Sequence, residues 1–94
     1  MEKPRVLIVD DEPGVRESLR LVLSGRVDPV LAASGEEALE RLAERRFDVV
    51  LLDILMPGID GLEVLERAQG LERPPQFIML TATKTVKTAV QAMK

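Results

Sequence analysis

Three aspartates are the residues of this sequence whose types and positions best suit a functional site. Asp10 and Asp11 directly follow the apolar run of residues 6–9, and Asp53 directly follows a second apolar run, residues 49–52. Such runs are typical of strands buried on both faces of a parallel sheet, whose carboxyl ends share one edge. Carboxylates gathered at that edge repel one another by about 4 kcal/mol per close pair at an effective dielectric constant near 20. We therefore expect a divalent cation there, at the edge where open α/β sheets bind their ligands.

The composition excludes several other kinds of chemistry. The chain contains no cysteine and no histidine, so it has no disulfide framework, no thiolate nucleophile and no histidine general base. Its 13 Lys and Arg against 16 Asp and Glu leave a net charge of -3, which argues against direct binding to nucleic acid through phosphate contacts. A length of 94 residues predicts a single domain.

The sequence also shows no sign of a membrane. Its first residues lead straight into a predicted strand without the apolar segment of a signal peptide. No apolar run approaches the length of about 18 residues that spans a bilayer. We therefore expect a cytoplasmic protein that does not bind a membrane.

Short apolar runs alternate with amphipathic stretches along the chain. This alternation predicts parallel strands joined by helical crossovers, which is the α/β class with a doubly wound parallel sheet. The predicted strands are residues 5–10, 27–32, 47–53 and 76–81. The predicted helices begin near Glu12, Ser34, Asp60 and Thr83.

Local signals support these helices. Pro13 suits a first helical turn, and Ser34 with Glu37 forms a capping box at the start of the second helix. Asp60 is interpreted as the N-cap of the third helix and not as part of the site. The apolar stripe predicted for the first helix consists of Val15, Leu19, Val22 and Leu23.

Three motifs together indicate a family. They are residues 9–12, with the adjacent acids; residues 52–61, in which Asp53 precedes a tight turn and a capped helix; and residues 80–82, Leu-Thr-Ala. In this order and spacing the chain resembles, over all 94 residues, the receiver domain of two-component response regulators. The family has a flavodoxin-like sheet of five parallel strands in the order 2-1-3-4-5. The resemblance thus implies four of the five βα units, with strand order 2-1-3-4.

The resemblance also assigns roles to residues. It implies that Asp53 accepts a phosphoryl group from a sensor histidine kinase and that Thr81 donates its hydroxyl to a phosphoryl oxygen and acts as the switch. The implied Mg²⁺ ligands are Asp10, Asp11, Asp53 and the backbone carbonyl of Leu55. Mg²⁺ suits such a site because it prefers oxygen ligands and binds through a few carboxylates plus phosphate.

A complete receiver continues with a fifth strand that ends in a lysine, followed by a fifth helix. Residues 1–94 do not include them, so we expect a receiver domain that is incomplete at its C-terminus. In the implied strand order the fourth strand then has an open edge, and open edges pair with other strands. We expect self-association through this edge.

Three functions are compatible with these features. The first is a phosphoacceptor module that is not an enzyme, serving as the regulatory part of a bacterial transcription regulator; residues 81–93 are similar to receivers attached to activators of the enhancer-binding ATPase class. The second is a magnesium-dependent phosphohydrolase of the haloacid-dehalogenase type, but the residue two positions after Asp53 is Leu55 and not the acid those enzymes use. The third is a noncatalytic truncated receiver that acts as an interaction or self-associating module.

Overall fold

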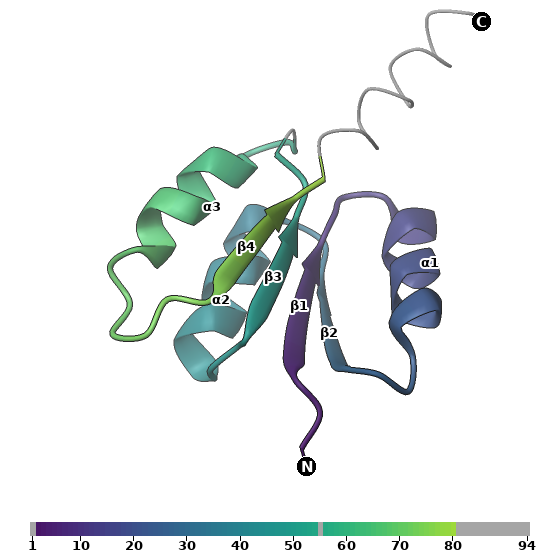
Figure 1. Ribbon diagram of the computed structural model, residues 1–94. Coiled ribbons are helices and arrows are strands. Elements are labelled where there is room, and N and C mark those ends of the chain that lie inside the picture. Colours follow the sequence, from purple (N-terminus) through teal and green to yellow (C-terminus); the bar gives the residue numbers. More distant parts are fainter. Residues whose placement is uncertain (1, 55, 81–94) are drawn as a thin grey trace, which may run out of the picture.

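The computed structural model describes residues 2–54 and 56–80. They form a parallel sheet with helices on both of its faces (Figure 1). Each element predicted within this part of the chain is present, although the strands are slightly shorter than predicted. The elements are β1 (Arg5–Val9), α1 (Pro13–Leu23), β2 (Asp28–Ala32), α2 (Gly35–Glu44), β3 (Val49–Leu52), α3 (Gly61–Ala68) and β4 (Gln76–Met79).

The sheet has the order β2-β1-β3-β4, and all neighbouring strands are parallel, which confirms the predicted fold class. The chain winds outward from β1 to β2 and then returns to place β3 on the other side of β1. In the register of β1 and β3, Val9 lies opposite Leu52. The next residues, Asp10 and Asp53, therefore leave neighbouring strands at the same level of the carboxyl edge.

One face of the sheet packs against α2 and α3 (Figure 1). Because side chains alternate between the faces of a strand, Leu7 and Val9 of β1 share this core with Val50 and Leu52 of β3, and all four are fully buried. The helices contribute Ala38, Leu42, Val64 and Ala68. This core holds β1 and β3 in fixed register beneath the acids at their ends.

On the opposite face, the described part of the chain places one helix, α1, which lies over β1 and β2 (Figure 1). It contacts β1 and β2, and none of its residues, all of which are described, is buried. Val15, Leu19 and Leu23 are half-buried, whereas Val22 is 73% exposed. Val22 thus belongs to the apolar stripe predicted from the sequence but is not covered by the sheet. The stripe spans a wider arc of the helix than the two strands beneath it cover.

Ser34 and Asp60 cap the N-termini of α2 and α3 as predicted, but Glu37 reaches the backbone N–H of Ala33 and not that of Ser34. Ser34 Oγ accepts a hydrogen bond from the backbone N–H of Glu37 at 3.1 Å, and Glu37 Oε1 accepts one from the backbone N–H of Ala33 at 2.6 Å. Asp60 Oδ1 accepts one from the backbone N–H of Glu63 at 3.0 Å. These caps satisfy backbone donors that have no partner within the helix, so the start of each helix is fixed.

Among residues 2–54 and 56–80, no helix has the length and apolar character needed to cross a bilayer. The predicted helix from Thr83 lies outside the described residues.

Candidate metal centre

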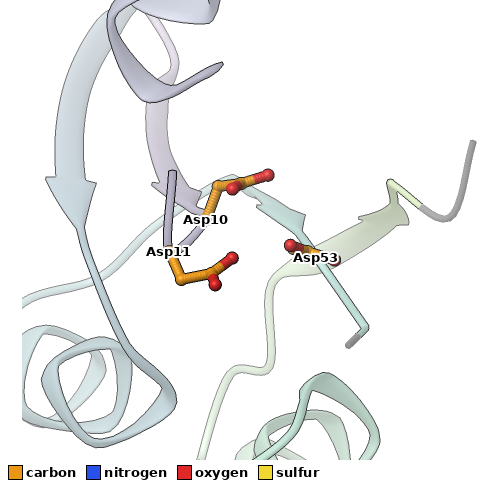
Figure 2. A group of neighbouring side chains, drawn as sticks. All are labelled: Asp10, Asp11 and Asp53. Atoms are coloured by element: carbon orange, nitrogen blue, oxygen red, sulfur yellow. The ribbon is translucent and has the colours of Figure 1, made fainter. Parts of the chain in front are cut away.

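Three carboxylates converge at the carboxyl edge of the sheet (Figure 2). Asp10 and Asp11 follow β1, and Asp53 follows β3. Each residue offers one carboxylate oxygen, and these oxygens all lie within 4.8 Å of one another. Asp10 and Asp53 are fully buried, and Asp11 is half-buried. The structure thus brings together the three acids that the sequence singled out.

Hydrogen bonds fix the backbone where β1 presents its two acids. The backbone N–H of Asp10 donates to the carbonyl of Ala32 at the end of β2, at 3.2 Å. Asp10 Oδ1 accepts from the backbone N–H of Glu12 at 2.9 Å. Asp11 therefore lies within a tight turn that is held on both sides.

A positively charged side chain, Arg16, also contacts this turn. Arg16, in the N-terminal part of α1, donates from Nη1 to the backbone carbonyl of Asp10 at 2.8 Å, and it is half-buried. Its guanidinium thereby fixes the turn and places positive charge beside the acids. Arg16 was not among the residues predicted from the sequence, although a signal existed. Side chains near the start of a helix point back toward its N-terminus, and here that end of α1 adjoins the acids.

The third acid is held by a close approach between backbones. The N–H of Asp53 donates to the carbonyl of Val9 at 3.0 Å, and the N–H of Gly61 donates to the carbonyl of Ile54 at 2.7 Å. A Cβ atom on Gly61 would lie 2.5 Å from the backbone oxygen of Asp53 and 2.6 Å from Ile54 Cα. Any larger residue would force these backbones apart. The role of Gly61 was not predicted from the sequence, because the approach exists only once β3 and α3 are packed together.

The three acids fit a small divalent cation. All of their donors are carboxylate oxygens, which suit Mg²⁺ and Ca²⁺ better than the metals that prefer nitrogen or sulfur. Burial of Asp10 and Asp53 removes much of the water that would otherwise weaken the repulsion between their charges. A divalent cation would offset this repulsion, so the chemistry of the donors agrees with the prediction of a cation at this edge.

Two residues that the resemblance assigned to the site, Leu55 and Thr81, lie outside the described residues. Their roles as a backbone ligand and as the switch stay predictions.

Comparison with known proteins identifies the family. The family model described as the response regulator receiver domain matches residues 6–94. The chain therefore belongs to the response regulator receiver domain family.

Its curated relatives are much longer. The positive alginate biosynthesis regulatory protein of Pseudomonas aeruginosa is 54% identical over 81 residues, which is 82% of this chain and 33% of that protein. The response regulator MprA of Mycobacterium tuberculosis is 42% identical over 90 residues, which is 95% of this chain and 39% of that protein. The chain thus spans between a third and two fifths of the length of these relatives.

Solved structures share the fold. The response regulator TrrA from Thermotoga maritima, crystallised in complex with Mg²⁺ and BeF, matches with a TM-score of 0.78 and 42% identity over 87% of this chain and 70% of that chain. The chemotaxis response regulator CheY4 of Vibrio cholerae matches with a TM-score of 0.76 and 30% identity over 82% of this chain and 67% of that chain. These matches confirm the receiver fold that the resemblance implied.

Proposed function

We propose that this domain is a phosphoacceptor module that takes a phosphoryl group from a sensor histidine kinase onto Asp53 in a Mg²⁺-dependent reaction. The observation that carries the proposal is the convergence of Asp10, Asp11 and Asp53, with carboxylate oxygens within 4.8 Å of one another, in a member of the receiver family. The crystallisation of TrrA with Mg²⁺ and BeF supports the choice of metal.

The reaction needs one nucleophile from this chain. A carboxylate oxygen of Asp53 forms a P–O bond while the P–N bond to the imidazole of the kinase breaks. The electrons of that bond return to the imidazole nitrogen, which takes a proton from solvent. The backbone contacts of Asp53 with Val9 and Gly61 hold the nucleophile in place, and positioning of this kind supplies much of the catalysis in phosphoryl transfer.

The metal would be held by the carboxylates of Asp10, Asp11 and Asp53 and by the carbonyl of Leu55. When bound, Mg²⁺ neutralises charge on both the carboxylate and the phosphoryl oxygens, so that two anions can approach each other. Thr81 is proposed to donate its hydroxyl to a phosphoryl oxygen and so to act as the switch.

In this proposal the domain is the target of a kinase and not itself an enzyme. It would serve as the regulatory part of a longer bacterial transcription regulator in the cytoplasm. The greater length of its relatives, one of which is named as a regulatory protein, supports a place for this domain within a longer regulator.

Incubation with acetyl phosphate and Mg²⁺, followed by mass spectrometry of the intact protein and its peptides, tests the proposal. We expect one phosphoryl group on Asp53. It should not form when a chelator removes Mg²⁺ before acetyl phosphate is added, and it should be absent from Asp53→Ala. Glu66→Ala, which removes an exposed acid of α3, is the matched control and should be labelled normally. Label at another residue, or label that persists in Asp53→Ala, would contradict the assignment.

A self-associating interaction module is the second candidate, and the edge of β4 favours it. Among the described strands β4 pairs with β3 alone. Its Ile78, on the sheet face opposite the core formed with α2 and α3, is 52% exposed and adds apolar surface beside that edge. Exposed edges recruit further strands. We expect sedimentation velocity at micromolar concentration to show dimers or larger species that Ile78→Lys dissociates, while Leu62→Lys, at an exposed apolar position on α3, does not. A wild-type protein that stays monomeric would argue against this candidate.

A further inference from the structure

A hollow lies between the C-terminal end of α2 and the loop that joins α3 to β4. It has a volume of about 380 Å³, enough for a large apolar side chain. Its floor is apolar: Leu42 and Phe47 are each 7% exposed, and Leu71 and Pro75 are half-buried. We call this feature the α2–α3 hollow.

The rim of the α2–α3 hollow is rich in arginine. Arg45, Arg46 and Arg73 line it and are exposed, and in the described part of the chain none of the three side chains forms an ion pair. The rim also carries two glutamates. One of these, Glu44, already pairs with Arg41 at 3.4 Å. The guanidinium groups on the rim are therefore only partly compensated by neighbouring acids.

The helix dipole accounts for part of this arrangement. Cations are favoured at a helix C-terminus, and Arg45 is the C-cap of α2. This explanation does not extend to Arg73, which lies on the loop between α3 and β4. Arg73 approaches the same hollow from a different part of the chain, so the cations gather around an apolar floor and not only around a helix end.

We propose that the α2–α3 hollow is a docking site for a protein segment that presents one large apolar side chain flanked by carboxylates. The apolar side chain would fill the space above Leu42 and Phe47. The flanking carboxylates would pair with Arg46 and Arg73, as arginine is well suited to bind carboxylates through two hydrogen bonds.

The surroundings of the hollow leave room for such a segment. Arg46, Phe47 and Arg73 also line a wider open hollow of about 1050 Å³ beneath the amino ends of the strands, so an extended chain could continue across this edge. The three acids lie at the other end of the strands, roughly 13 Å away along a strand of four residues. A segment bound here would leave the carboxyl edge accessible.

Fluorescence anisotropy with a defined probe tests the proposal. The probe is a fluorescein-labelled peptide with a central leucine between two pairs of glutamates, and we expect saturable binding to the wild-type chain. Replacing the leucine by alanine should weaken binding by about tenfold, because the hollow loses most of the apolar contact. Replacing the glutamates by lysines should abolish binding.

Reversing the charge of arginines on the rim tests whether the peptide binds at the α2–α3 hollow. The double variant Arg46→Glu with Arg73→Glu should bind the probe at least about tenfold more weakly. Arg26→Glu is the matched control, since Arg26 is exposed but lines neither hollow, and it should bind like the wild type. Because all three arginines are exposed, circular dichroism should show unchanged folding.

Several results would overturn the proposal. These are the absence of saturable binding, equal weakening by Arg26→Glu, or equal binding of the peptide with central alanine. Competition by a single-stranded oligonucleotide as effective as that by the unlabelled probe would show a general polyanion site in place of a docking site for a protein segment.

Discussion

At the scale of single residues, Asp53 keeps its position because a glycine lets α3 approach the end of β3. A Cβ atom at position 61 would lie only 2.5 Å from the backbone oxygen of Asp53, which is too close for any real side chain. We expect Gly61→Ala to lower the free energy of unfolding by about 1 to 3 kcal/mol, the usual cost of forcing atoms into a packed site, and to weaken Mg²⁺ binding because Asp53 moves. Calorimetric titration and urea unfolding measure the two effects.

Gly14→Ala is the control for this substitution. A Cβ atom at Gly14 would meet nothing within 4 Å, and alanine favours the helix that Gly14 occupies. The control should be at least as stable as the wild type. Equal stability of Gly61→Ala and the wild type would contradict the account of the close approach.

Arg16 gives a second prediction at this scale. Arg16→Gln removes both a hydrogen bond to Asp10 and a positive charge beside the acids, so it should lower the free energy of unfolding by about 1 to 2 kcal/mol without Mg²⁺. With saturating Mg²⁺ the loss should be smaller, because the ion supplies positive charge in its place. Arg26→Gln is the control, and an equal loss with and without Mg²⁺ would contradict the electrostatic role.

The site residues that the sequence predicted differ from those that only the structure revealed. Asp10, Asp11 and Asp53 were predictable as candidates because acids at the ends of parallel strands emerge at one edge of the sheet. Arg16 and Gly61 act through a bond or a contact that depends on how a helix packs against that edge. The sequence alone does not show which helix atoms come close to the ends of β1 and β3.

At the scale of elements, the capping box of α2 sets where the helix begins. Ser34→Ala removes the acceptor for the N–H of Glu37 and should lower the free energy of unfolding by about 1 kcal/mol, the typical effect of losing a cap. Since the chain has no tyrosine or tryptophan, unfolding by urea is best followed by circular dichroism. Ser18→Ala, at an exposed position within α1, should not destabilise the protein, and an equal loss in both variants would contradict the capping role.

The elements themselves were largely predictable from local patterns. Apolar runs, the capping box and the cap at Asp60 located β1, β3, α2 and α3 because these signals act within a few residues. The exposure of Val22 was not predictable in this way. It depends on how much of α1 the sheet covers, which is decided by elements distant in the sequence.

At the scale of the whole molecule, strand order explains why the acids share one site. The chain reverses its direction of winding between β1 and β3, and ligands bind at such a switch point in open α/β sheets. Local patterns predicted parallel strands, but the order 2-1-3-4 came from the resemblance to receivers. Patterns along one chain do not show which strands become neighbours.

The measurement that tests the shared cation most directly is thermal unfolding of the wild type and Asp11→Asn, each with a chelator and with Mg²⁺. Without the ion, Asp11→Asn should be more stable by about 1 kcal/mol, because one repelling charge is gone; the gain is smaller than the repulsion of a close pair because Asp11 is half-buried and water screens its charge. With Mg²⁺ at about ten times its Kd, the wild type should gain about 1.4 kcal/mol and the variant much less, so the order of stability reverses. Equal stabilisation of both proteins by Mg²⁺, or none of either, would contradict a cation held jointly by Asp10, Asp11 and Asp53.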